Sequence, residues 1–155
     1  MITINNKVPD FTANATSNKE ITLSAFKGKN IILYFYPKDS TPGCTTEGQD
    51  FTSLYNQFTE LDTVIFGVSR DSIASHEKFK AKYNFTFDLL SDPEEKLCKL
   101  FDVIKQKSLY GKQYMGIERS TFLIDKAGIL KQEWRKVKVK KHAEAVLSEV
   151  RLLNA

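Results

Sequence analysis

The sequence is poor in the residues that build disulfide scaffolds, metal centres and membrane spans. Its 155 residues include only two cysteines, Cys44 and Cys98, which are too few for a disulfide framework and are typical of a reducing compartment. The two histidines, His76 and His142, have no further ligand residues at a familiar metal-binding spacing, so we expect no metal and place both at the surface. No apolar run approaches the roughly 18 residues of a membrane-spanning helix, so we expect no membrane partner.

Sequence signatures of several other functions are also missing. The seven glycines form neither a Gly-x-Gly-x-x-Gly nor a Walker-type run, so no nucleotide cofactor is expected. There is no Cys-x-x-Cys, which argues against a disulfide carrier of the thioredoxin kind. The N-terminal residues 1–7 lack a long apolar core, so we expect no secretory peptide and a cytoplasmic location.

The composition that is present is typical of one soluble globular domain spanning residues 1–155. The net charge of +4 is mildly basic, and much of the excess lies in residues 135–141. Such a run either binds a nucleic acid or forms a charged edge strand or loop. Only Trp134 supplies an aromatic ring beside it, so we favour the charged edge and expect no nucleic-acid partner.

Apolar runs and amphipathic stretches alternate along the first part of the chain, and a hairpin and a helix close it. The predicted strands are residues 20–24, 31–36, 63–69, 85–90, 120–125 and 129–134. The predicted helices are residues 42–59, residues 71–83, a helix that opens at Asp92-Pro93, and residues 141–153, with a polar connection at 103–115. This order favours an α/β fold with a mixed central sheet flanked by helices.

The segment 37–44 joins a predicted buried strand to a predicted amphipathic helix and holds Cys44 at the junction. Pro37 ends the strand, and Thr41 followed by Pro42 is a typical N-cap and first helical residue. Cys44 then falls in the first turn, where unpaired backbone N–H groups and the helix dipole favour a thiolate over a thiol. The same residues also fit a small buried cysteine at a helix start, so they leave its reactivity open.

This segment, Pro37-x-x-x-Thr41-x-x-Cys44, resembles the active-site motif of peroxiredoxins. Its longer form at residues 34–47, Tyr-Phe-Tyr-Pro-Lys-Asp-x-Thr-Pro-Gly-Cys-Thr-x-Glu, is similar to the bacterioferritin-comigratory, or Q-type, subfamily. The resemblance continues in order through Gly-Val-Ser at 67–69, Leu-Ser-Asp at 90–92 and Gly-Ile-x-Arg-x-Thr-Phe-Leu-Ile-Asp at 116–125. It covers nearly the whole chain and implies the thioredoxin-like fold that peroxiredoxins share.

The resemblance implies a thiol-dependent peroxidase that reduces hydrogen peroxide and organic hydroperoxides. The Cys44 thiolate would attack the peroxide and become a sulfenic acid while an alcohol or water leaves. Arg119, a permanent cation, would hold the thiolate and a peroxide oxygen together. Thr41 would orient the peroxide through its hydroxyl, and Pro37 would shield the pocket from water. Glu47, one turn after Cys44, is expected to organise Arg119 or the loop, although an ordinary surface glutamate fits nearly as well.

The sequence departs from the Q-type pattern at one position. Many members carry a second, resolving cysteine five residues after the first, where this chain has Gln49. Either an external thiol reduces the Cys44 sulfenic acid, or Cys98 resolves it by forming a disulfide. Cys98 also fits a buried apolar position, and we favour the one-cysteine route with thioredoxin, glutaredoxin or glutathione as reductant. The resemblance further implies a monomer.

One alternative function stays open from the sequence, a redox-sensing adaptor that signals through oxidation of Cys44 without catalysis. Such an adaptor would keep the cysteine but has less need of Arg119. The presence of Pro37, Thr41 and Arg119 together with Cys44 therefore favours the peroxidase.

Overall fold

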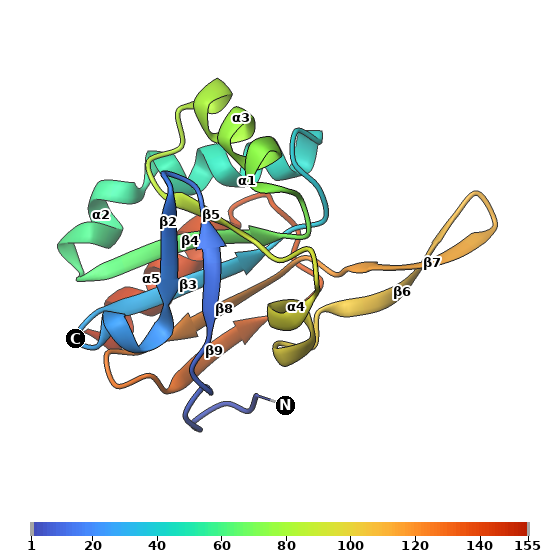
Figure 1. Ribbon diagram of the computed structural model, residues 1–155. Coiled ribbons are helices and arrows are strands. Elements are labelled where there is room, and N and C mark those ends of the chain that lie inside the picture. The colour runs from blue at the N-terminus through green and yellow to red at the C-terminus, as the bar shows by residue number, and fades with distance from the viewer. Residues whose placement is uncertain (1, 155) are drawn as a thin grey trace.

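The computed structural model describes residues 2–154, which build a seven-stranded mixed sheet with helices packed on it and a separate two-stranded hairpin (Figure 1). The strands are β1 (Thr12–Ala15), β2 (Lys19–Thr22), β3 (Asn30–Phe35), β4 (Thr63–Ser69), β5 (Asp88–Ser91), β6 (Ile104–Leu109), β7 (Lys112–Ile117), β8 (Ser120–Ile124) and β9 (Leu130–Trp134). The helices are α1 (Pro42–Ser53), α2 (Tyr55–Glu60), α3 (Ile73–Tyr83), α4 (Lys96–Leu100), α5 (His142–Leu153) and the 3₁₀ helix η1 (Leu23–Phe26). None of the helices in this part of the chain is long and apolar enough to cross a membrane.

Strand β3 lies at the centre of the sheet, whose strand order is β2-β1-β5-β4-β3-β8-β9. It runs parallel to β4 and antiparallel to β8, and β4 runs parallel to β5. All six residues of β3 are buried, as a run of β-branched and aromatic residues predicts for a strand that is covered on both faces. The mixed central sheet flanked by helices is therefore as the sequence predicts.

The side chains of β3 alternate between two apolar cores. Ile32 faces the core under α1, α2, α3 and α5, whereas Leu33 faces the core under η1 and α4. The first core contains Cys44 and the second contains Cys98. The two cysteines therefore lie on opposite faces of the sheet.

The predicted helix 42–59 begins where expected but is broken at Leu54. This residue has φ −98° and ψ 2°, and it separates α1 from α2. The break redirects the chain so that Phe58 enters the core, where it is fully buried, and α2 packs against β4. The apolar spacing continues across the break, so the sequence pattern alone does not reveal it.

The helix that the sequence places at Asp92-Pro93 starts later, at Lys96. The Asp92 carboxylate accepts hydrogen bonds from the backbone N–H groups of Leu97 at 3.2 Å and Cys98 at 2.8 Å. Asp92 thus caps α4 from a distance, while the chain between them turns through Glu95 with φ 63°. Asp92 is thus a capping residue, as the sequence predicts, but the helix begins at Lys96 instead of directly after it.

The predicted polar connection at residues 103–115 is wrong, because this stretch forms the hairpin β6–β7, which projects from the body of the molecule (Figure 1). The register closes with Leu109 opposite Lys112 around Tyr110 and Gly111, which have φ 51° and 77°. Two consecutive residues with positive φ are typical of a tight hairpin turn. Most of the hairpin is exposed on both faces, so the sequence has no apolar alternation from which to predict the strands.

Gly48 allows α1 to approach the ring of Phe85 closely. A Cβ atom on Gly48 would lie 2.3 Å from Phe85 Cζ, well inside van der Waals contact. We expect Gly48→Ala to lower the free energy of unfolding by about 1–3 kcal/mol through overpacking, although alanine is the better helix former by up to about 1 kcal/mol. Urea unfolding followed by circular dichroism measures this, with Gln49→Ala at the exposed neighbouring position as control. Equal stabilities of the two variants would contradict the prediction.

Candidate active site

Cys44 is the third residue of α1, where the chain passes from β3 into the helix. Thr41 is the N-cap in extended conformation and Pro42 is the first helical residue, as the sequence predicts. The Thr41 hydroxyl makes no capping bond and instead donates to the carbonyl oxygen of Lys38 at 2.8 Å. The Cys44 side chain is only 1% exposed, so its sulfur is packed against the interior rather than displayed at the surface.

Arg119 reaches Cys44 across 75 positions of sequence because β8 pairs with β3. Ser120 lies opposite Phe35, so Arg119 stands at the end of β3 from which the Cys44 segment leaves. Its Nη2 lies 3.4 Å from Cys44 Sγ, and its Nη1 donates to Glu47 Oε1 at 2.7 Å. Burial lowers the pKa of Arg119, but the charges of Glu47 and Cys44 more than offset this, and the net pKa lies above the ordinary value. The guanidinium therefore stays charged in this buried place.

Glu47 lies one turn after Cys44 on the buried face of α1, and its side chain is 1% exposed. Oε1 accepts from Arg119, whereas Oε2 is buried without a hydrogen-bond partner among residues 2–154. Burial raises the pKa of Glu47 to about 7, and the charge and hydrogen bond of Arg119 oppose this only in part. Glu47 is therefore buried at the site, and the alternative that it is an ordinary surface glutamate is excluded.

The loop between β3 and α1 carries two of the other predicted site residues. Pro37 is its second residue, directly after the buried Tyr36, and Thr41 is its last; Pro37 and Thr41 are both half-buried. The structure thus brings Cys44, Glu47 and Arg119 into contact and places Pro37 and Thr41 on the loop that leads to them.

Asp39, in the middle of this loop, is a residue of the site that sequence reasoning missed. Its carboxylate accepts from the hydroxyls of Tyr36 and Ser75 at 2.7 Å each and lies 2.7 Å from His76 Nδ1, while His76 Nε2 donates to the carbonyl oxygen of Leu90 at 2.8 Å. Burial raises the pKa of Asp39, but its hydrogen bonds, led by that of His76, more than offset this and hold it below the ordinary value. The ionised Asp39 ties the Cys44 loop to α3.

The prediction that both histidines lie at the surface is wrong. His76 is fully buried and His142 is 7% exposed. The His142 ring packs edge-on against Phe51 and Trp134, and its Nε2 lies 2.8 Å from the Thr121 hydroxyl. Burial, together with the charge of Arg119, lowers the pKa of His142 to about 4, so this ring is neutral. One signal for His76 was in the sequence, since it precedes the buried Phe79 by three positions on α3, which is the spacing of one helix face.

Asp39, Asp71 and His76 are the described side chains that could converge on a metal ion, with ligand atoms within 4.8 Å of one another. Their oxygens already accept hydrogen bonds, since Asp71 Oδ2 accepts from the backbone N–H of Asp39 at 2.9 Å and from the Ser69 hydroxyl at 2.5 Å. These hydrogen bonds explain why the three side chains lie together: they hold the loop that leads to Cys44 in place.

Cys98 is not brought to Cys44. It is fully buried on the other face of the sheet, and both cysteines are free thiols. Burial, reinforced by the neighbouring Asp92, raises the pKa of the Cys98 thiol, so it stays protonated. Gln49, at the position where many Q-type members carry the resolving cysteine, is exposed on α1.

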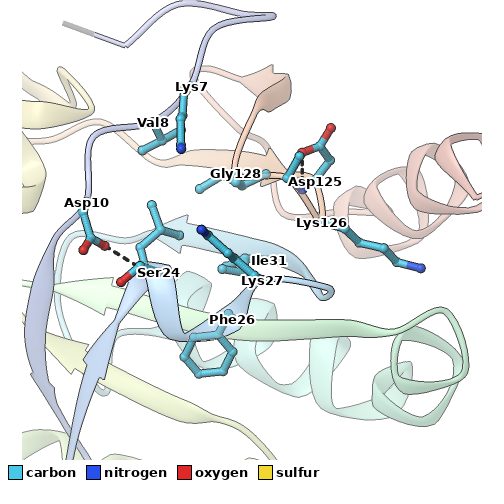
Figure 2. A pocket seen from close by; sticks show the side chains of 13 residues that line it. Lys7, Val8, Asp10, Ser24, Phe26, Lys27, Ile31, Asp125, Lys126 and Gly128 are labelled. Carbon is cyan, nitrogen blue, oxygen red and sulfur yellow. Dashed lines mark hydrogen bonds between the residues drawn. The ribbon is translucent and has the colours of Figure 1, made fainter.

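Two hollows help to locate the site on the molecule. A groove of about 630 Å³ between α1 and the start of α5 is lined by Gly43, Thr46 and Lys140 among others, and it borders the Cys44 segment. A cavity of about 130 Å³ lies at the other end of β3, beside Ile31 and between the N-terminal segment, η1 and the turn after β8 (Figure 2). Neither hollow is lined by Cys44, Glu47 or Arg119. The contacts of these three side chains therefore place the candidate active site, at the end of β3 that the first groove borders.

The chain is similar in sequence to known peroxiredoxins. Residues 4–133 match the model of the AhpC/TSA family. Peroxiredoxin Bcp of Bacillus subtilis is 55% identical over 150 residues, which cover 97% of this chain and 96% of the relative. Peroxiredoxin Bcp of Xanthomonas campestris is 53% identical over 142 residues, which cover 92% of this chain and 89% of the relative.

The fold of the chain is also similar to those of solved peroxiredoxin structures. The bacterioferritin comigratory protein of X. campestris aligns with a TM-score of 0.90 and 50% identity, covering 94% of this chain and 92% of that one. The PrxQ of Xylella fastidiosa aligns with a TM-score of 0.95 and 42% identity, covering 100% of this chain and 99% of that one. These similarities confirm the thioredoxin-like peroxiredoxin fold and the Q-type resemblance.

Proposed function

This chain belongs to the AhpC/TSA family as a peroxiredoxin of the Bcp or Q type, and from that membership we propose that it works as a one-cysteine thiol peroxidase centred on Cys44. Peroxiredoxins of this type are thiol-dependent peroxidases that reduce peroxides, and so is this chain. The observation that carries the assignment of residues is the Arg119 guanidinium, which contacts Cys44 Sγ and Glu47 Oε1 at the same time.

In the proposed reaction the Cys44 thiolate attacks one oxygen of the peroxide. A sulfur–oxygen bond forms and the O–O bond breaks, so the sulfur is oxidised to a sulfenic acid while the other oxygen leaves as an alcohol or water after gaining a proton. Arg119 stabilises the thiolate and the charge that develops on the leaving oxygen. Because the Thr41 hydroxyl donates to Lys38, its oxygen is left to accept the O–H of the peroxide. Pro37 shields the reacting atoms from water.

An external thiol then reduces the sulfenic acid. Two observations support this route over an internal disulfide: Gln49 stands at the usual resolving position, and Cys98 lies on the opposite face of the sheet with its thiol protonated. The first external thiol displaces water from the sulfenic acid to form a mixed disulfide, and a second thiol releases Cys44. Thioredoxin, glutaredoxin and glutathione supply such thiols in the cytoplasm, where we place the protein as a monomer.

The Cys98→Ser variant is expected to keep wild-type turnover, because Cys98 takes no part in the proposed cycle. Steady-state peroxidase assays with the thioredoxin and the glutathione systems measure this, and Cys98→Ala controls for a polar hydroxyl in the apolar core. Mass spectrometry of the peroxide-treated protein under non-reducing conditions gives the second readout. A stoichiometric disulfide between Cys44 and Cys98 within one monomer would overturn the one-cysteine assignment.

We propose organic hydroperoxides as substrates alongside hydrogen peroxide. The structure of the X. campestris relative comes from work on the alkyl peroxide reduction activity of that protein. Competition between hydrogen peroxide and an alkyl hydroperoxide in the same assay ranks the two classes. Consumption of hydrogen peroxide alone would restrict the proposal to that substrate.

A further inference from the structure

The active site buries two acidic groups against one cation. The Arg119 guanidinium is shared between Cys44 Sγ at 3.4 Å and Glu47 Oε1 at 2.7 Å. The Cys44 residue and the Glu47 side chain are each 1% exposed, and the Arg119 side chain is 16% exposed. Arg119 can neutralise one negative charge, and a second buried anion without its own cation is costly. Ionising one acid therefore disfavours ionising the other.

Among residues 2–154, Arg119 is the cation that contacts this pair of acids, and the groups around it supply no second one. Asp50, one turn further along α1, adds negative charge near Glu47. Tyr34 of β3 is neutral because burial raises its pKa, and His142 of α5 is neutral because burial lowers its pKa to about 4. Lys107 of β6 is close enough to feel the charges of Cys44 and Arg119, and burial together with Arg119 lowers its pKa. Asp39, on the loop before α1, is a further anion near the site, and it bonds to His76.

Glu47 also has an oxygen that suits a proton. Oε2 has no hydrogen-bond donor among the described residues, and neither does the buried hydroxyl of Tyr34 find a partner there. An ionised carboxylate would leave a charged oxygen buried with no donor, whereas a protonated carboxyl places a neutral O–H at this point. Burial raises the pKa of Glu47 to about 7, which agrees with this geometry.

We propose that Cys44 and Glu47 share a single negative charge opposite Arg119, so that Glu47 holds a proton while Cys44 is a thiolate. This proton then balances the reaction. The thiolate, the Glu47 acid and a peroxide ROOH become the sulfenic acid, the Glu47 carboxylate and the alcohol ROH, with one negative charge on each side. The sulfur loses two electrons, the O–O bond breaks, and the leaving oxygen gains the proton from Glu47. Arg119 is then paired with the Glu47 carboxylate.

The charge sharing is tested by titration without any peroxide. The rate at which iodoacetamide alkylates Cys44, mapped by mass spectrometry, is measured against pH for the wild type, Glu47→Gln and Asp50→Asn. Coupled groups titrate in two steps separated by about one pH unit or more, so the wild type should show two steps. Glu47→Gln keeps an oxygen for Arg119 but cannot ionise, so a single step at lower pH is expected. Asp50→Asn, which removes a neighbouring charge without touching Arg119, should resemble the wild type.

The proposal would be overturned if the alkylation rate of Cys44 depended on pH in the same way in the wild type and Glu47→Gln. It would also be overturned if Glu47→Gln and Asp50→Asn shifted this pH dependence equally. Infrared spectroscopy gives a readout that does not depend on folding of a variant. In the wild type, the carbonyl band of a protonated carboxylic acid should be present below about pH 7 and vanish above it. A band that is absent at pH 5.5, where most surface carboxylates are already ionised, would also contradict the sharing.

The proton transfer rests on the proposed peroxidase function and is tested by the pH profile of peroxide reduction. The wild-type rate constant should fall above about pH 7, because Glu47 then ionises and no longer holds the proton. Glu47→Gln should lose this alkaline limb and react roughly 10²-fold more slowly at pH 6, the usual size of a general-acid effect. A uniform loss at every pH would assign Glu47 a purely structural role. Coupled titration without any peroxidase activity would instead contradict the proposed function and leave the charge sharing intact.

Discussion

The Cys44→Ser variant is expected to lose at least about 10³-fold in kcat/KM for peroxide, with every reductant, because the nucleophile is removed. A serine hydroxyl is not ionised at neutral pH, so the Arg119 guanidinium has no anion to direct at the peroxide. The fold should persist, since oxygen replaces sulfur in a similar volume at a position that is 1% exposed. The loss therefore reports chemistry rather than unfolding.

Hydrogen peroxide consumption with dithiothreitol measures this effect, and unchanged thermal unfolding of the variant verifies the fold. Cys98→Ser is the matched control, because it removes the other thiol of the chain and should keep the activity. Equal and negligible rates in the wild type and Cys44→Ser would favour the redox-sensing adaptor over the enzyme. Full activity in Cys44→Ser would show that the nucleophile lies elsewhere.

Arg119→Met should lower kcat/KM by roughly 10²–10³-fold, the usual cost of removing a preorganised electrostatic donor. The guanidinium contacts the sulfur and Glu47 with two different nitrogens, so methionine removes the cation while filling a similar volume. Lysine has a single charged nitrogen and cannot reproduce both contacts in this planar geometry, so Arg119→Lys should recover little of the activity. Recovery of wild-type kcat/KM in Arg119→Lys would show that the bidentate contact is dispensable.

In Arg119→Met the stability should depend more strongly on pH than in the wild type, where the raised pKa of Glu47 already couples the two. Arg119 lowers the pKa of Glu47, so its removal raises that pKa further above the unfolded value of 4.5. A carboxyl with a raised folded pKa binds more protons in the native state, and stability then falls as pH rises above about 4.5. Arg119→Met should therefore be less stable at pH 8 than at pH 5, relative to the wild type. The double variant with Glu47→Gln should lose this pH dependence while its activity stays low.

The local sequence around Cys44 predicted its own structure well. The strand ends at Phe35, just before Pro37, Thr41 is the N-cap and Pro42 is the first helical residue. Such residues act on backbone atoms within a few positions of themselves, which is why they could be predicted. The buried strands β3 and β4 were predicted for a similar reason, since an unbroken apolar run needs cover on both faces. Arg119 was predicted as a site residue only through the family resemblance. It lies close to Cys44 in space because β8 pairs with β3.

Other features have a weak local signature or none. The break at Leu54 serves the burial of Phe58, and His76 is buried because Asp39 and Leu90 offer it partners from distant segments. The hairpin β6–β7 pairs with itself and is largely exposed, so its residues show no apolar alternation. The burial of Phe58 and His76 is thus set by contacts between distant parts of the chain, whereas the hairpin joins neighbouring segments that carry no apolar pattern.

The sequence by itself thus determined that a cysteine stands in the first turn of a helix after a central strand, and that the usual resolving cysteine is absent. The tertiary structure alone decided that Cys98 lies across the sheet from Cys44, and that Glu47 is buried on Arg119 with one oxygen unpaired. The physical reason is the distance along the chain over which each interaction acts. Capping and strand termination act over a few residues, whereas burial and charge pairing depend on which strands become neighbours.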